Sequence, residues 1–241
     1  MGLTLIDKTT WQLEAANNNA NLYRHMLEAH GIPYECSDEL FHTTVLPLPF
    51  YSSIVTRLPA TKPELINDLT RTATFDLYVK DSFADLSLKQ FGFNKLFDAC
   101  WFHLTETVIE DTSGWEQVKT AQQLEHWETA WKASGNLTDR QMFPPALLTN
   151  PNMTFWGFRK AGQYTKGFIG NSSDNSTGLS NTFAGALSPQ EFRQMAGLLQ
   201  AWQPSKSIVG YARDETLHCA TQAGFESSGN LTVWVKPFSS S

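Results

Sequence analysis

In the second half of the chain, some segments have apolar residues at every second position, which predicts strands. Other segments have them at every third or fourth position, which predicts helices. Ser188, Pro189 and Glu191 form a capping box with proline at the first helical position, which predicts a helix from here to Trp202. The predicted order is strand, two helices, three antiparallel strands, helix, strand, helix and strand. The six strands are placed at residues 115–119, 155–158, 165–169, 178–184, 207–212 and 231–235.

The first half predicts a shorter series of elements. Thr9 and Thr10 precede a helical pattern that ends at Gly31. A proline-rich extended segment at 46–50 leads into a predicted strand, and a helix is predicted to start at Lys62-Pro63. The predicted strands of this half lie at residues 53–58, 75–79 and 100–104, with a short helix at 84–93.

One order of elements occurs twice in the chain. It is a strand followed by a short helix, a Gly-Phe pair and another strand. Gly92-Phe93 and Gly224-Phe225 lie 132 positions apart, so each half of the chain holds one copy. The polar, turn-forming segment 110–114 separates the halves. We therefore predict tandem halves at residues 1–110 and 111–241, of which the first is truncated.

Composition narrows the class of protein. The chain has 241 residues, 41% of them apolar and 12% aromatic, which predicts a packed core rather than a disordered chain. The net charge is −6, and the sequence has no cluster of lysines and arginines. Nucleic acids and anionic membrane surfaces are therefore not expected as partners.

Targeting and redox features favour a cytoplasmic protein. Residues 1–8 lack the basic start and apolar run of a signal peptide, and no apolar stretch has the length of a membrane span. The three cysteines, Cys36, Cys100 and Cys219, are scattered and have no metal or redox spacing, as expected in a reducing compartment. The six histidines show no metal-ligand spacing either, so no metal site is expected. The sequence does not indicate an oligomeric state.

The order of elements in the second half resembles the GNAT superfamily of N-acetyltransferases. The resemblance covers residues 115–236 well and residues 53–108 as a partial second copy, and its most specific parts are 208–211, 220–225 and 231–234. It implies an α+β fold, a mixed sheet with helices on both faces. It also implies the transfer of an acetyl group from acetyl-CoA to a small amine.

The same resemblance implies the position of a site. Acyl-CoA in such proteins lies in an opening between two central parallel strands, which here are 179–184 and 207–212. The family often has a tyrosine that protonates the leaving thiolate at the position that is Ala220 here, so Tyr211 on the neighbouring strand is the best available proton donor and His218 the second candidate. The residues that would hold acetyl-CoA are Asn181, Thr182, Phe183 and Ala184 along the pantetheine, and Gly185 and Ala186 beneath the phosphates.

The segment before the capped helix departs from the family pattern. The family has Arg/Gln-x-x-Gly-x-Gly/Ala here, whereas this chain has Phe183-Ala-Gly-Ala-Leu-Ser-Pro-Gln-Glu191. The capping box occupies two helix amides that could otherwise meet a phosphate, and Glu191 adds a negative charge. The alternative is therefore a non-catalytic protein of the same fold that binds a small molecule or a protein partner.

Overall fold

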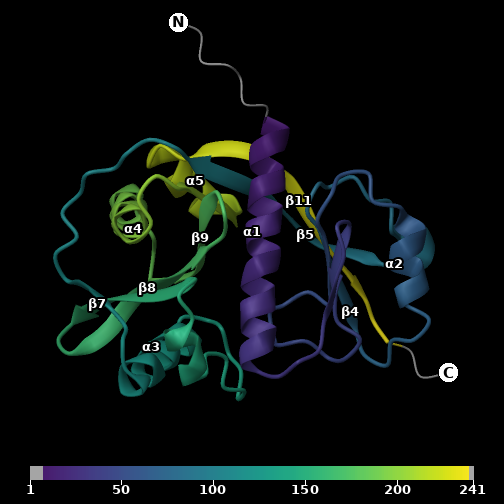
Figure 1. Cartoon of the computed structure of the whole chain (residues 1–241), viewed down its shortest axis with the longest axis horizontal. Coiled ribbons are helices and arrows are strands. Elements are labelled where there is room, and N and C mark those ends of the chain that lie inside the picture. The colour runs from purple at the N-terminus through teal and green to yellow at the C-terminus, as the bar shows by residue number, and fades with distance from the viewer. Residues whose placement is uncertain (1–7, 239–241) are drawn as a thin grey trace, which may run out of the picture.

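The computed structural model describes residues 8–238, in which eleven strands form one mixed sheet (Figure 1). The strand order is β1-β2-β3-β4-β11-β5-β10-β9-β8-β7-β6. The strands are β1 (Glu35–Cys36), β2 (Leu40–His42), β3 (Ile54–Thr56), β4 (Leu77–Asp81), β5 (Asn94–Leu104), β6 (Trp115–Gln117), β7 (Met153–Lys160), β8 (Gln163–Ser172), β9 (Ser176–Phe183), β10 (Ser207–Ala212) and β11 (Glu226–Lys236). The helices are α1 (Lys8–Ala29), α2 (Pro63–Leu69), α3 (Ala121–Ala133), α4 (Pro189–Trp202) and α5 (Asp214–Gln222), with 3₁₀ turns η1 (Lys89–Phe91) and η2 (Pro145–Thr149).

Two parallel strand pairs lie on either side of a central antiparallel pair. β3 runs parallel to β4, β9 runs parallel to β10, and β11 and β5 pair between them. The last strand of each predicted half lies beside the parallel pair of the other half, β11 next to β4 and β5 next to β10. The sheet is therefore continuous across the proposed boundary at residue 110. The relation of the halves as copies and the division at 110 stay predictions.

Helices cover both faces of the sheet, which confirms the predicted α+β class. α1 crosses the middle of the sheet and shares one face with α3, where their apolar residues pack against Phe155 and Ile169 (Figure 1). α4 and α5 pack on the opposite face against Phe168 and Ile208. The neighbours Phe168 and Ile169 point to opposite faces because strand side chains alternate. None of the described helices has the length and apolarity needed to cross a membrane.

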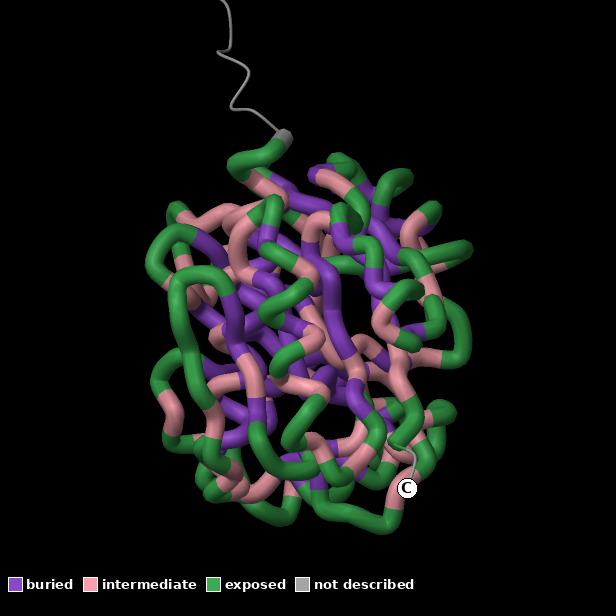
Figure 2. Tube along the Cα trace, turned by 90° about the vertical axis from the view of Figure 1, so that its right-hand side faces the viewer, coloured by how far each residue is buried: buried purple, intermediate pink, exposed green. Residues whose placement is uncertain are grey.

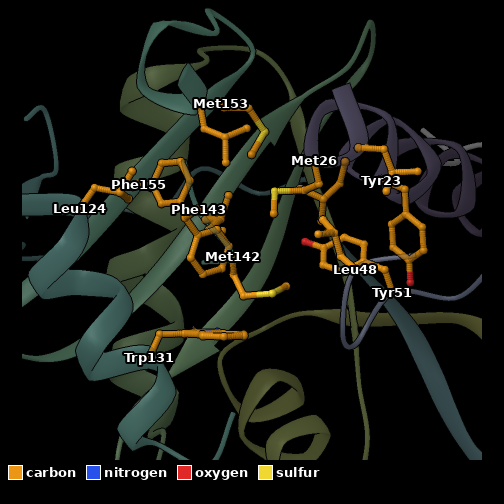
Figure 3. Close-up of a cluster of buried hydrophobic side chains, with 14 of the residues drawn as sticks. Tyr23, Met26, Leu48, Tyr51, Leu124, Trp131, Met142, Phe143, Met153 and Phe155 are labelled. Atoms are coloured by element: carbon orange, nitrogen blue, oxygen red, sulfur yellow. The ribbon is translucent and has the colours of Figure 1, made fainter. Parts of the chain in front are cut away.

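The largest buried cluster joins α1, α3 and the strands β7 and β8 (Figure 3). Trp127 of α3 is fully buried, and its Nε1 donates a hydrogen bond to the carbonyl of Trp156 at 2.8 Å. Its ring meets Phe143, Phe155 and Phe183 edge to face, which is a favourable aromatic geometry. Buried segments run through the interior of the chain, and exposed segments form its outer turns (Figure 2).

The helix predicted at 84–93 is wrong. Only the single 3₁₀ turn η1 forms there, and Ala84 has a φ of 53°. The buried carboxylate of Asp81 accepts hydrogen bonds from the amides of Asp85 and Leu86, at 3.3 and 3.0 Å. These bonds hold a turn that competes with a helical start.

Two other differences concern short elements. The strands β1 and β2 were not predicted, because elements of two or three residues are too short for an alternating pattern. The second helix of the later half is the 3₁₀ turn η2. The expectation about a signal peptide concerns residues 1–8, and residues 1–7 lie outside the described residues.

Two buried histidines make stability depend on pH. His25 and His103 are 5% and 6% exposed, and burial lowers the pKa of each. The unfolded chain therefore takes up protons below about pH 6.5 before the folded chain does. We expect the free energy of unfolding to fall as the pH is lowered from about 7 to about 5. Urea unfolding at several pH values measures this loss.

The control for that loss is the exposed His126. His103→Gln should reduce the slope of stability against pH, and His126→Gln should leave it unchanged. A stability that is constant or rises between pH 7 and pH 5 would contradict the assignment.

Candidate active site

The parallel strands β9 and β10 diverge after three residues. Their pairing covers Ser176, Thr177 and Gly178 on β9 only, although β9 continues to Phe183 and β10 to Ala212. β10 remains paired with β5 through Ala212, and β9 remains paired with β8. Beyond Gly178 the facing edges of the two strands therefore have backbone groups that are free to bind a ligand.

A bulge on β9 directs the strand away from β10. Ser180 pairs with Ile169 and Phe183 with Gly167, so β9 has one residue more than β8 over this stretch. The extra residue lies at Asn181, whose φ of 49° is in the left-handed region that asparagine tolerates better than most residues. Asn181, which was predicted to lie along the pantetheine, is thus the extra residue of β9 beyond the point where its pairing with β10 ends.

Glycine keeps the base of this opening narrow. A Cβ at Gly210 would lie 2.7 Å from the carbonyl oxygen of Leu179 and 2.6 Å from the ring of Phe102. No side chain fits there without moving the backbone of β9. The two strands can approach at Gly210 and separate beyond it.

The divergence holds a cavity of about 270 Å³, which we call the splay cavity. It lies between residues 179–182 of β9 and 210–212 of β10, and residues of α1 also line it. Asn18 and Asn19 of α1 face it, and both are buried. A CoA molecule is far larger than this space, so only its pantetheine end and acyl group fit inside.

A second cavity of about 720 Å³ lies next to the first, and we call it the strap cavity. It lies between the segment 46–52 and the strands β4 and β5. The two cavities share four aromatic residues that form the wall between them: Tyr23, Phe50, Tyr51 and Tyr211. Figure 3 shows Tyr23 of α1 beside Tyr51, and their ring centres are 4.7 Å apart.

Tyr211 is the predicted catalytic residue that faces both cavities. It is 36% exposed, and its ring meets Trp101 edge to face at 5.3 Å. The ammonium of Lys80 lies 4.3 Å from the centre of the same ring. A phenol that separates two cavities can give a proton to a group in one of them while a second molecule occupies the other.

Two buried polar groups lie at this wall: Tyr51 is part of it, and Lys80 lines the strap cavity beside it. Burial by itself lowers the pKa of Lys80, but charge interactions and hydrogen bonding with Tyr211 and Tyr23 outweigh it and raise the pKa. The Nζ of Lys80 lies over the faces of the Tyr23 and Tyr211 rings, a geometry that stabilises a cation. Burial also raises the pKa of Tyr51, which the nearby Asn181 side chain only partly offsets, so this hydroxyl stays protonated.

The remaining predicted site residues lie in different places. Thr182 lines the splay cavity with Asn181. Phe183 is 4% exposed and packs on Trp127 in the core. Ala184 is half-buried and Gly185 and Ala186 are exposed, in the loop between β9 and α4. His218 is exposed on α5, and its side chain lines neither cavity.

The predicted capping box is present at the start of α4. The amide of Ser188 donates to Oε2 of Glu191 at 2.7 Å, and the amide of Glu191 donates to the Ser188 hydroxyl at 3.3 Å. The ammonium of Lys166 on β8 also pairs with Oε1 of Glu191. Lys166 thus compensates the negative charge that the sequence places beside the helix start.

Sequence reasoning did not identify Lys80, Tyr51 or Tyr23. Tyr78 and Lys80 alternate with the apolar Leu77 and Val79, a pattern that normally indicates a solvent-facing side of a strand. Asn19 and Tyr23 of α1 contact the ammonium on that side, and the lysine is buried. Lys80 directly follows the strand predicted at 75–79, and this position was the only available signal.

No family model matches this sequence, and no curated protein matches it. Solved structures match its fold. A GCN5-related N-acetyltransferase from Kribbella flavida has a TM-score of 0.65 at 13% identity, over 93% of this chain and 96% of that chain. A GCN5-related N-acetyltransferase from Sphaerobacter thermophilus has a TM-score of 0.52 at 10% identity, over 93% of each chain. Saccharomyces cerevisiae N-myristoyltransferase, solved with bound myristoyl-CoA, has a TM-score of 0.51 at 10% identity, over 83% of this chain and 62% of that chain.

The chain therefore has the fold of the GCN5-related N-acetyltransferases, as the order of its elements predicted. Identities of this size establish the fold and leave the reaction to be argued from the site.

Proposed function

We propose that this protein is a CoA-dependent N-acyltransferase that transfers an acetyl group from acetyl-CoA to a small amine. The observation that carries the proposal is the pair of adjacent cavities with Tyr211 in their common wall. One cavity lies where two parallel strands diverge, with free backbone groups for the pantetheine amides. The other gives an acceptor access to the same wall from the opposite side.

The chemistry assigned to this wall is one displacement at a thioester carbonyl. The amine nitrogen attacks the carbonyl carbon, the carbon–sulfur bond breaks, and the sulfur leaves as a thiolate. Tyr211 gives its proton to that thiolate, and the attacking nitrogen, which is positively charged once it has bonded to the carbonyl carbon, returns a proton to Tyr211 and leaves a neutral amide. Asn181 and Thr182 hold the pantetheine beside this wall, and His218 is the reserve proton donor.

The start of α4 is the proposed phosphate site. The amides of Gly185 and Ala186 make no hydrogen bond among the described residues, and a Cβ at Gly185 would meet nothing within 4 Å. These exposed amides can approach a pyrophosphate at the positive end of the helix.

Removing the charge of Glu191 should tighten CoA binding. Glu191→Gln keeps a side chain that can cap α4 and leaves the Lys166 ammonium uncompensated beside the phosphates. The expected gain is about two- to fivefold in Kd, the size of a helix-terminus charge effect. Calorimetric titration with CoA measures it. Lys166→Gln is the matched control and should weaken binding, and an unchanged or weaker Kd for Glu191→Gln contradicts the phosphate site.

The second candidate is a non-catalytic protein of this fold that binds a small molecule or a protein partner. The capping box favours it, because Ser188 and Glu191 occupy each other's amides and Pro189 has no amide hydrogen to donate. Release of free CoA thiol from acetyl-CoA in the presence of a panel of small amines separates the candidates. Amine-dependent thiol release supports the transferase, and its absence for every amine favours the binding protein.

A further inference from the structure

Lys80 is a buried cation without a carboxylate partner. Its side chain is 2% exposed and lines the strap cavity. Its Nζ donates to Oδ1 of Asn19 at 2.8 Å and lies 4.9 Å from the ring centre of Tyr23 and 4.3 Å from that of Tyr211. None of the ion pairs among the described residues includes it. A buried charge is costly unless it is paired, so this position favours an anion supplied by a ligand.

The lining of the strap cavity becomes more exposed with distance from Lys80. Asp76, Tyr78 and Lys80 lie on one face of the β4 segment, and their burial increases from the exposed Asp76 to the buried Lys80. The lining residues Leu46 and Leu96 are 61% and 52% exposed and give the exposed part of the cavity an apolar surface beside the charged Asp76 and Arg140. A ligand that fits places its anion at the inner end and its apolar part at the mouth.

The anion that fits has a single charge. Arg140 also lines the strap cavity but is exposed, so at the buried end one ammonium compensates a carboxylate, whereas a phosphate dianion would leave a charge there without a partner. Tyr51 offers a further donor, because its hydroxyl is buried, lines the cavity and has no hydrogen-bond partner of normal geometry among the described residues. A carboxylate has enough acceptor positions for both groups.

The position of Lys80 also restricts how far the carboxylate can be from the amine. Its Nζ is 4.3 Å from the ring centre of Tyr211, which forms part of the wall to the splay cavity. An anion on Lys80 is therefore already close to that wall. The reacting amine must be close to it as well, so both groups must lie within a few bonds of each other in the acceptor.

We propose that the strap cavity binds the acceptor and that the acceptor is an α-amino acid with an apolar side chain, its carboxylate held by Lys80 and Tyr51. The binding of the amino acid is inferred from the strap cavity alone, and the acyl transfer that follows rests on the proposed function. The apolar side chain lies toward Leu46 and Leu96, and the amine faces Tyr211.

Calorimetric titration of the full chain with matched ligands tests the inference. The probes are L-phenylalanine and L-leucine, compared with phenethylamine and isoamylamine, which lack the carboxylate, and with L-phenylalaninamide, which has no negative charge. The amino acids should bind at least about tenfold tighter than the matched amines and the amide. Amines or the amide that bind as tightly as the amino acids overturn the proposal, as does the absence of binding by both amino acids.

A pair of variants assigns the effect to the buried lysine. Lys80→Met should reduce the preference for the amino acids to less than about twofold, and Lys160→Met, on an exposed lysine of β7, should retain it. A full preference in a folded Lys80→Met protein overturns the role of Lys80. If that variant does not fold, Tyr51→Phe, which should weaken amino-acid binding and not amine binding, decides in its place.

Titration with acetyl-CoA separates this inference from the proposed function. Amino-acid binding without acetyl-CoA binding overturns the transferase and keeps the cavity assignment. Acetyl-CoA binding without a preference for the carboxylate overturns the amino-acid acceptor and keeps the transferase.

Discussion

Thr182→Trp should weaken acetyl-CoA binding strongly while the chain stays folded. Thr182 lines the splay cavity and is only half-buried, so a larger side chain can occupy the cavity without displacing packed core residues. The cavity of about 270 Å³ has no room for both an indole and a pantetheine arm. We expect the Kd for acetyl-CoA to rise by about a hundredfold, or about 2.8 kcal/mol.

Calorimetric titration with acetyl-CoA and a thermal melt of the same sample measure both parts of that expectation. Thr165→Trp is the matched control, because Thr165 is exposed on β8 and lines neither cavity. Normal binding by a folded Thr182→Trp protein would place the acyl-CoA site elsewhere.

Replacing Tyr211 with phenylalanine should lower turnover by about a hundredfold, the usual contribution of a general acid. The substitution removes the proton donor and keeps the ring that packs on Trp101 and lies over the Lys80 ammonium. The Kd for acetyl-CoA should stay almost unchanged, because the hydroxyl gives a proton rather than a binding surface. Thiol-release kinetics give kcat, and titration gives the Kd.

The control is Tyr34→Phe, which removes a hydroxyl bonded to Glu28 and does not touch either cavity. It should leave turnover unchanged. Unaltered turnover in Tyr211→Phe would eliminate Tyr211 as the general acid and leave His218 as the candidate proton donor.

The elements of the second half were predictable because each has its own local signal. The capping box starts α4, and alternation marks β7, β8 and β9. The helix predicted at 84–93 failed for a reason that is not visible in an apolar pattern. The carboxylate of Asp81 binds the following amides, and its burial depends on the packing of distant segments.

The candidate site was predictable only where it depends on strand order. The divergence of β9 from β10 follows from two parallel strands at the centre of this fold, so Asn181, Thr182 and Tyr211 could be proposed from sequence. Lys80 and Tyr51 belong to the first half of the chain. They reach the site because β11 and β5 join the two parallel strand pairs and α1 packs over β5, β10 and β11. No local sequence pattern encodes that long-range strand pairing.

Direct titration of the unmodified chain with acetyl-CoA tests the central claim, that the opening between β9 and β10 binds an acyl-CoA. We predict heat of binding with one molecule of acetyl-CoA per chain and a rise in melting temperature at saturating ligand. No heat and no thermal shift at millimolar acetyl-CoA would contradict the claim.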